Sequence, residues 1–325
     1  MNAYDMFNVI LNSNQAIVLA TIIKVEGSSY RKEGAMLLCM EDGSHVGLIS
    51  GGCLERDLVE KAKIVFLDGI SRTVTYNLAD EDDLSWGQGS GCNGVITVLL
   101  ELVDMNYKAH LKRVQQLLSE GISVQHTKYL TENGTVVKYG FSTGTESVEC
   151  LEDVENTSFI FQQVFRPKPR LIIFGAGIDA RPLGQFAYQS GFETIITDWR
   201  PAFCQKEFFP GATQTIVAYP NEFTKDFVYR RDDIVVIMTH NFRRDEEILA
   251  KLLKEELLYI GILGPRQRTL RLLKNQDDIE RIHSPVGLPI GAVGPEEIAI
   301  SIMAEIIKVV RKGEEDDNWY LSSSR

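Results

Sequence analysis

One segment restricts the possible folds more than any other: a glycine-rich turn that directly follows a short apolar run. The apolar run, residues 171–174, has the character of a buried parallel strand, and the turn reads Gly175-Ala176-Gly177-Ile178-Asp179-Ala180 ahead of a helical pattern. In a strand-turn-helix unit, G-x-G-x-x-A allows the tight turn, the close approach of a pyrophosphate and close helix packing. The segment therefore predicts the first βα unit of a nucleotide-binding fold.

A carboxylate at the end of the next strand supports this interpretation. The strand predicted over residues 193–197 ends at Asp198, which comes 21 residues after Gly177. A ribose-binding carboxylate is expected about 20 residues after the glycine turn. Arg200 then has two possible roles, since it either meets the 2′-phosphate of NADP or caps Asp198. Gly175, Gly177 and Asp198 are therefore candidates for binding NAD(P) or another nucleotide.

The rest of the C-terminal half completes a doubly wound parallel sheet. Strands expected over 232–238 and 259–263 flank a helix expected over 245–258, which gives the order βαβαβ. Ligands of such sheets bind beyond the carboxyl ends of the strands, which places His240 and Arg266 near the site. His240 is interpreted either as a general base or as a structural hydrogen-bonding residue, with the structural role favoured. Arg266 either anchors a phosphate or lies on a solvated face.

Two cysteines lie between glycines in the N-terminal half. The segments are Ser50-Gly51-Gly52-Cys53-Leu54-Glu55 and Gly89-Ser90-Gly91-Cys92-Asn93-Gly94. Glycines permit a tight, solvent-reachable turn, so Cys53 and Cys92 are candidates for reactive thiols, with Gly51, Gly52 and Gly91 shaping their loops. A helix predicted over 54–67 puts Cys53 at a helix N-terminus, where a thiolate or a bound anion is favoured. The alternative is a small residue in a crowded turn.

The chain is expected to form an N-terminal α+β domain followed by the nucleotide-binding-type domain. Apolar alternation and turn residues predict strands over 16–23, 35–40, 45–49, 71–78 and 95–103. Two closely spaced prolines, Pro167 and Pro169, mark the main boundary. The expected parts are an α+β domain over 1–104, an intervening helix, hairpin and linker over 105–165, the doubly wound domain over 166–313 and a charged tail over 314–325.

The composition disfavours nucleic acid and membranes as partners. A net charge of −11 over 325 residues disfavours nucleic acid and anionic membranes, and no early apolar run is long enough to span a bilayer. Five widely spaced cysteines in a chain of this size indicate the reducing cytoplasm. The sequence contains no C-x-x-C, H-E-x-x-H or H-x-x-x-H motif, so a metal site built by the protein alone is not expected.

These motifs, taken in order, resemble those of the XdhC/CoxI family, the accessory proteins of xanthine dehydrogenase and related molybdenum hydroxylases. The N-terminal matches are Gly27-Ser28-Ser29-Tyr30-Arg31, Gly34-Ala35 and the two cysteine segments. The C-terminal matches are Gly175-Ala176-Gly177, Asp198-Trp199-Arg200, Thr239-His240, Gly261-Ile262-Leu263-Gly264, Pro285-Val286-Gly287-Leu288 and Pro295-Glu296-Glu297-Ile298-Ala299. The sequence departs from the family pattern at Tyr30, Asn93, Asn241 and Pro265. The resemblance implies an XdhC/CoxI domain followed by a Rossmann domain.

The resemblance also implies a function: a chaperone that binds molybdenum cofactor (molybdopterin), assists its sulfuration by a cysteine desulfurase and delivers it to a xanthine dehydrogenase-type hydroxylase. Cys53 and Cys92 would then contact the molybdenum or its sulfur, and Arg31 would contact an anionic group. A chaperone is favoured over a turnover enzyme, and a homodimer is expected. Two alternatives stay open, an NAD(P)-dependent oxidoreductase and an adaptor whose nucleotide site is vestigial.

Overall fold

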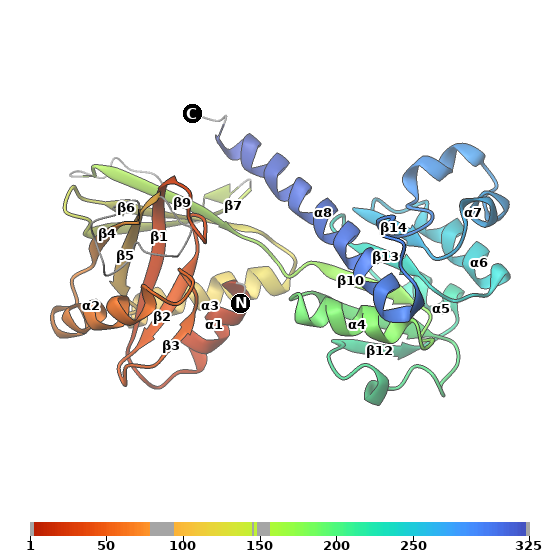
Figure 1. The fold of residues 1–325 in the computed structure, drawn as a ribbon, viewed down its shortest axis with the longest axis horizontal. Helices are drawn as coiled ribbons and strands as arrows, with labels where there is room; N and C mark the ends of the chain where they lie inside the picture. The colour runs from red at the N-terminus through yellow and green to blue at the C-terminus, as the bar shows by residue number, and fades with distance from the viewer. Residues whose placement is uncertain (1–2, 79–93, 145, 148–156, 323–325) are drawn as a thin grey trace. The chain divides into compact units, whose positions relative to one another are not determined.

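The protein is described by a computed structural model that covers residues 3–78, 94–144, 146–147 and 157–322. The chain divides into two compact units, residues 1–167 and 168–325 (Figure 1). Each unit has its own sheets and its own hydrophobic core. The helix and hairpin expected as an intervening segment belong to the first unit.

The first unit is built on a five-stranded antiparallel sheet in the order β3-β2-β1-β5-β4. Its central strand β1 is buried along its first seven residues, because both faces of the sheet are covered. Helix α2 (Glu55–Asp68) packs against β1, β2 and β5, and it buries Leu58, Ala62 and Val65. The strands are β1 (Ile17–Gly27), β2 (Met36–Met40), β3 (His45–Gly47), β4 (Arg72–Asn77) and β5 (Gly94–Leu102).

The opposite face is covered by two helices and a second sheet. Helices α1 (Ala3–Asn12) and α3 (Met105–Ser119) share an apolar core with residues of β1, β2 and the second sheet, which has the order β8-β7-β6-β9. Asp104 caps α3 by accepting a hydrogen bond from the Tyr107 backbone N–H. The second sheet consists of β6 (Val124–Leu130), β7 (Val136–Thr143), β8 (Glu146–Ser147) and β9 (Phe159–Phe165).

A buried ion pair links the two sheets of the first unit. Lys128 on β6 pairs with Glu101 on β5, and both side chains are almost completely buried. Tyr139 donates a hydrogen bond of 2.8 Å to Glu101 Oε2, and Lys128 Nζ lies 3.4 Å from Thr21 Oγ1. Buried charges need such partners, because an isolated charge in the interior is very costly.

The second unit contains the predicted doubly wound parallel sheet, in the order β12-β11-β10-β13-β14. Helices α4 (Ala180–Gln189) and α8 (Gly294–Ser322) share one core with the sheet, while α5 (Pro220–Asp226) and α6 (Phe242–Leu252) cover the other face. The strand order reverses between β10 and β13, which is the usual place for a ligand crevice. The strands are β10 (Arg170–Phe174), β11 (Glu193–Asp198), β12 (Gln214–Val217), β13 (Ile234–Ile237) and β14 (Tyr259–Ile262).

The C-terminal part of this unit surrounds β14. Short elements α7 (Arg266–Leu272) and η2 (Gln276–Arg281) follow the strand, and η1 (Lys206–Phe208) precedes β12. Helix α8 begins at Gly294 and runs on to Ser322, into the segment predicted as a charged tail. None of the described helices combines the length and apolar character that a membrane-spanning helix needs.

Candidate functional site

The loop between β3 and α2 presents the predicted thiol to solvent. Cys53 is exposed, whereas the neighbouring Leu54 is fully buried and anchors the start of α2. Cys39 and Cys204, the other cysteines in the described residues, are buried. Burial raises the pKa of the Cys39 thiol to about 12 and also raises the pKa of Cys204. Among the described cysteines, Cys53 is therefore the one placed to react.

Ser50 and Glu55 hold this loop in shape. Glu55 is 2% exposed, and its Oε1 accepts hydrogen bonds from the backbone N–H groups of Ile49 (2.9 Å) and Ser50 (2.7 Å). Ser50 Oγ donates to Glu55 Oε2 at 2.6 Å, accepts from the Gly52 and Leu54 N–H groups, and lies 3.6 Å from Cys53 Sγ. Burial raises the pKa of Glu55, but these hydrogen bonds outweigh burial and bring the pKa below its usual value.

The two glycines before Cys53 have different roles. Gly52 has a φ of 110°, a backbone conformation that favours glycine. A Cβ atom placed on either Gly51 or Gly52 would meet no heavy atom within 4 Å. The positive φ at Gly52 is the backbone conformation that a tight turn of this kind was predicted to need.

Arg31, another predicted N-terminal site residue, lies in a loop at the same end of the first sheet. Arg31 is exposed in the loop between β1 and β2, and its carbonyl oxygen accepts a hydrogen bond from Ser29 Oγ. Strand β2 begins opposite Thr21 and β3 ends opposite Leu37, while β1 runs on to Gly27 in the same direction, so the Arg31 and Cys53 loops leave the sheet at the same end. The first described residue of β5, Gly94, pairs there with Gly27.

Gly94 is required by close packing rather than by its own φ. A Cβ at this position would lie 2.5 Å from the Ser28 carbonyl oxygen and 2.6 Å from that of Glu26. The N-terminal site residues Gly91 and Cys92 precede Gly94 in the sequence and lie outside the described residues. Their proposed roles stay predictions.

The glycine turn of the second unit has the predicted backbone. Gly175 has a φ of 107°, and a Cβ there would lie 2.5 Å from the Met238 carbonyl oxygen, so the first glycine is required. Gly177 differs, because its Cβ position would lie 2.8 Å from Asp179 Oδ1. The face of Gly177 that a pyrophosphate would approach is therefore covered by a carboxylate of the same loop.

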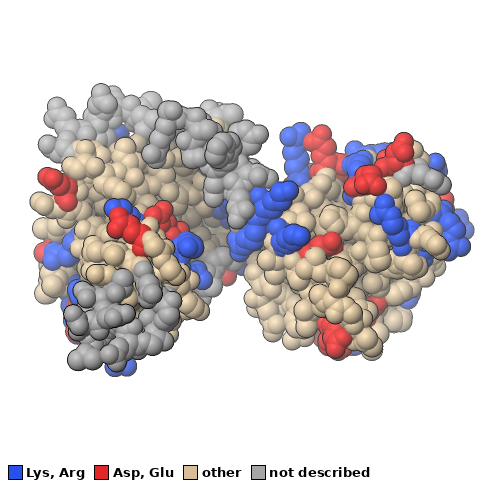
Figure 2. Space-filling model, turned by 45° about the horizontal axis from the view of Figure 1, so that its top comes forward, with Lys and Arg blue, Asp and Glu red and all other residues tan. Residues whose placement is uncertain are grey.

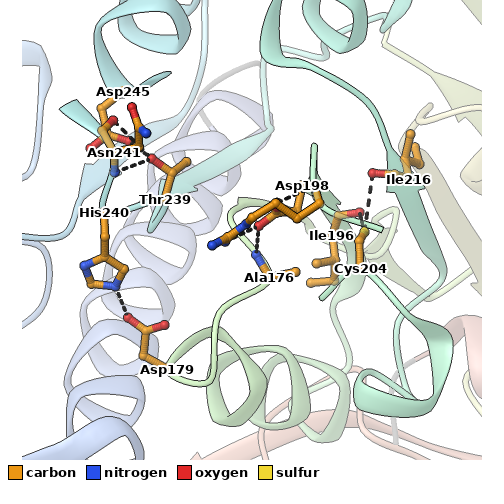
Figure 3. Close-up of polar contacts among 11 residues, drawn as sticks. Ala176, Asp179, Ile196, Asp198, Cys204, Ile216, Thr239, His240, Asn241 and Asp245 are labelled. Carbon is orange, nitrogen blue, oxygen red and sulfur yellow. Dashed lines mark hydrogen bonds and ion pairs between the residues drawn. The ribbon is translucent and has the colours of Figure 1, made fainter. Parts of the chain in front are cut away.

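Asp198 is buried and fully engaged within the protein. Its Oδ1 accepts hydrogen bonds from Arg200 N (2.9 Å) and Nε (3.0 Å), and its Oδ2 accepts from Ala176 N and Arg200 Nη2, both at 2.8 Å (Figure 3). Arg200 thus caps Asp198, one of its two predicted roles. Burial raises the pKa of Asp198, but the bonds from Arg200 and Ala176 outweigh it and keep the pKa low.

His240 has a partner that sequence reasoning did not assign. Its Nε2 lies 2.5 Å from Asp179 Oδ2, so the pair joins the loop after β13 to the loop after β10 (Figure 3). His240 has a φ of 57°, which is uncommon for a residue with a side chain. Asp179 precedes α4 but makes no side-chain cap to that helix. Its carboxylate is directed to His240 instead.

A shallow hollow lies at the carboxyl ends of the sheet strands. It encloses a volume of about 0 Å³, whereas typical ligand pockets hold roughly 300–1,000 Å³. Thr239 in its wall bonds the buried Asp245 of α6, which also pairs with Arg268 at 2.7 Å. The hollow is lined by Phe174, Gly175, Thr197, Asp198, Trp199, Ala218, Pro220, Thr239 and Ile248.

Arg266, the last predicted site residue, is not part of this hollow. Its side chain is 49% exposed at the start of α7 and pairs with Glu280 at 3.3 Å. Figure 2 shows a similar mixture on the visible face of the second unit, where basic side chains adjoin acidic ones. The structure therefore gives Arg266 the solvated position that was one of its two predicted alternatives.

Sequence reasoning missed three residues that shape these loops: Ser50, Glu55 and Asp179. Ser50 and Glu55 lie in the motif that drew attention to Cys53, and a serine and an acidic residue around a helix start are a capping signal. Asp179 has the residue type and position of an N-cap. Nothing in the local sequence indicates its pairing with His240, 61 residues away.

The architecture is therefore that of a two-unit protein with a cysteine-bearing α+β unit and a Rossmann unit. Two family models match the chain: the XdhC and CoxI family over residues 10–77, and the XdhC Rossmann domain over residues 171–306. The chain is 40% identical over 324 residues to a probable xanthine dehydrogenase subunit of Bacillus subtilis (strain 168), covering 96% of this chain and 98% of the relative. The chain belongs to the XdhC and CoxI family, which confirms the resemblance.

Two further similarities cover nearly the whole chain. The molybdenum cofactor insertion chaperone PaoD of Escherichia coli (strain K12) is 26% identical over 323 residues, covering 94% of this chain and 87% of the relative. The crystal structure of a xanthine dehydrogenase from Bacillus halodurans has a TM-score of 0.89 and 50% sequence identity, covering 96% of each chain.

Proposed function

We propose that this chain is an accessory protein of a xanthine dehydrogenase-type molybdenum hydroxylase. In this role it binds molybdenum cofactor as cargo, assists its sulfuration and delivers it to the hydroxylase. Family membership and the similarity to a molybdenum cofactor insertion chaperone support the proposal. The observation that carries it is the exposed Cys53 on a loop held by buried Ser50 and Glu55.

The cysteine loop suits the chemistry of this cargo. Thiolate is a soft ligand that matches a sulfur-rich molybdenum centre, and an arginine is suited to a phosphate group. The loops of Cys53 and Arg31 leave the first sheet at the same end, which supports a proposal in which one cargo molecule contacts both. In this proposal Cys53 and Cys92 contact the molybdenum or its terminal sulfur, and Arg31 contacts an anionic group of the cofactor.

The remaining parts of the proposal concern partners and compartment. A cysteine desulfurase supplies the terminal sulfur, and the hydroxylase receives the finished cofactor. An exposed free thiol is suited to the reducing cytoplasm. A homodimer would help to enclose a labile cofactor. Size-exclusion chromatography with light scattering tests the dimer, and co-purification with each enzyme tests the partners.

The direct test is anaerobic binding of molybdenum cofactor to the full chain. The wild-type protein should bind it stoichiometrically, and Cys53→Ser, Cys92→Ser and Arg31→Ala should each weaken binding at least tenfold. Lys32→Ala is the matched control for Arg31→Ala, because Lys32 is an exposed basic neighbour in the same loop. Absence of cofactor binding, or equal binding by all variants, would overturn the assignment of the site.

The alternative of an NAD(P)-dependent oxidoreductase rests on Gly175, Gly177 and Asp198. It requires that the second unit bind a dinucleotide. Equilibrium dialysis of the full chain with NADH and with NADPH measures such binding. A Rossmann domain alone does not establish an oxidoreductase, because folds of this type serve many functions.

A further inference from the structure

The Rossmann unit contains the fingerprint of a dinucleotide site, yet its recognition groups are already engaged with each other. A bound dinucleotide needs two things from this fold: space for its pyrophosphate at the second glycine, and a carboxylate to accept bonds from its ribose. In this chain the Asp179 carboxylate occupies the space beside the second glycine, Gly177. The acceptor sites of the Asp198 carboxylate are occupied by Arg200.

The pyrophosphate position carries a negative charge of the protein itself. Asp179 Oδ1 lies 2.8 Å from the point where a Cβ on Gly177 would stand, which is the side a phosphate approaches. A phosphate there would displace the carboxylate or meet it as a like charge. His240 Nε2 holds the carboxylate in place from the neighbouring strand, at 2.5 Å from Oδ2.

The ribose position is closed in the same way. A carboxylate offers about four acceptor sites, and Asp198 uses four: one N–H of Ala176 and three of Arg200. The Asp198 side chain is completely buried in this arrangement. A ribose hydroxyl would therefore have to displace Arg200 before it could bond Asp198.

We propose that Asp179 is an internal substitute for the pyrophosphate and closes the Rossmann crevice of this chain to NAD(P). The pair with His240 then ties the loops after β10 and β13 across the switch point, and the unit keeps its fold without a dinucleotide. This inference is independent of cargo binding at the cysteine loop, since it concerns a different unit of the chain.

The test is equilibrium dialysis of the full chain with NADH and with NADPH at neutral pH. The wild-type protein should bind either dinucleotide more weakly than about 1 mM, and Asp179→Ala should bind at least one of them at least tenfold more tightly. His240→Ala should show a smaller gain than Asp179→Ala, because the carboxylate stays in the loop but loses the residue that holds it beside Gly177. Asp226→Ala is the matched control, since it removes an exposed carboxylate at the end of α5, outside the hollow.

Two results would overturn the inference. One is wild-type binding of NADH or NADPH tighter than about 1 mM, which would mean that the crevice is open. The other is no gain of binding in Asp179→Ala, which would mean that removing the Asp179 carboxylate does not open the crevice. Circular dichroism of each variant verifies folding, and Asp179→Asn, which removes the charge but keeps the shape, serves as a second variant with a smaller expected gain.

Discussion

The hydroxyl of Ser50 donates a hydrogen bond of 2.6 Å to the buried carboxylate of Glu55, and this contact sets the shape of the loop that exposes Cys53. Leu54, at the N-cap position of α2, has no side-chain cap to offer the helix. Ser50 and Glu55 bind the backbone N–H groups around the turn instead. The loop that exposes Cys53 thus has a base fixed by buried hydrogen bonds, which suits its proposed role in positioning a ligand.

Replacing Glu55 by alanine should destabilise the first unit. The change leaves the buried N–H groups of Ile49 and Ser50 without their acceptor, and unpaired buried groups of this kind cost about 1–3 kcal/mol each. Urea denaturation should show the loss in the free energy of unfolding. Glu60→Ala, on the exposed side of the same helix, should change it by less than about 0.5 kcal/mol.

The contribution of Glu55 should depend on pH. The pKa of Glu55 in the folded protein lies below its ordinary value of 4.5. The ionised carboxylate therefore contributes its full stabilisation above that ordinary value, and the contribution is lost as pH falls through the folded-state pKa. The difference in unfolding free energy between wild type and Glu55→Gln should narrow as pH falls below the ordinary value. A difference that stays constant over this range would contradict the assignment.

Thiol reactivity should separate Cys53 from the buried cysteines. In a Cys92→Ser, Cys150→Ser background, the remaining cysteines are Cys39, Cys53 and Cys204. A maleimide reagent should label Cys53 alone in the folded protein and all three cysteines after denaturation, because Cys39 and Cys204 are buried. Labelling should disappear from the folded protein in the added Cys53→Ser variant. Rapid native labelling at Cys39 or Cys204 would contradict the structure.

The two glycines before Cys53 should respond differently to alanine. Gly52→Ala forces a side chain into a backbone conformation with φ of 110° and should cost about 1 kcal/mol or more in unfolding free energy. Gly51→Ala should change it by less than about 0.5 kcal/mol, because its φ is not positive and a Cβ there meets no neighbour. Paired urea titrations measure both. Equal costs would contradict the assignment of the Gly52 effect to its positive φ.

Breaking the buried Lys128–Glu101 pair should be among the most damaging changes in the first unit. Lys128→Met leaves the Glu101 carboxylate buried without its cation, at an expected cost of about 3–5 kcal/mol. The double variant Lys128→Met, Glu101→Gln should recover much of the loss, since the amide can still accept from Tyr139.

An exposed ion pair supplies the control for that comparison. Lys24 and Glu26 are 2.7 Å apart on β1, and both side chains are more than half exposed. Lys24→Met should lower the free energy of unfolding far less than Lys128→Met does, because solvent screens the exposed pair. If the two lysine variants had equal effects, the burial of the Lys128 pair would not be the cause of its contribution.

The sequence alone determined the features that depend on local spacing. Strands and helices around Cys53 and around the turn at Gly175 follow from apolar periodicity and glycine positions, and the doubly wound sheet follows from the order of those elements. Local patterns were weaker elsewhere. Helix α1, strand β9 and the β12–α5 segment were not predicted, because each is short or lacks strong periodicity and is held mainly by packing against the rest of its unit.

The tertiary structure decided which side chains meet. Asp179 has the sequence position of a helix cap, but the parallel pairing of β10 with β13 brings His240 to it from 61 residues away. The sequence likewise left Arg200 with two possible partners, a phosphate and Asp198. In the structure Arg200 pairs with Asp198, because a buried carboxylate without a partner would be costly. Local sequence sets backbone conformation, whereas partners of polar groups depend on long-range topology and burial.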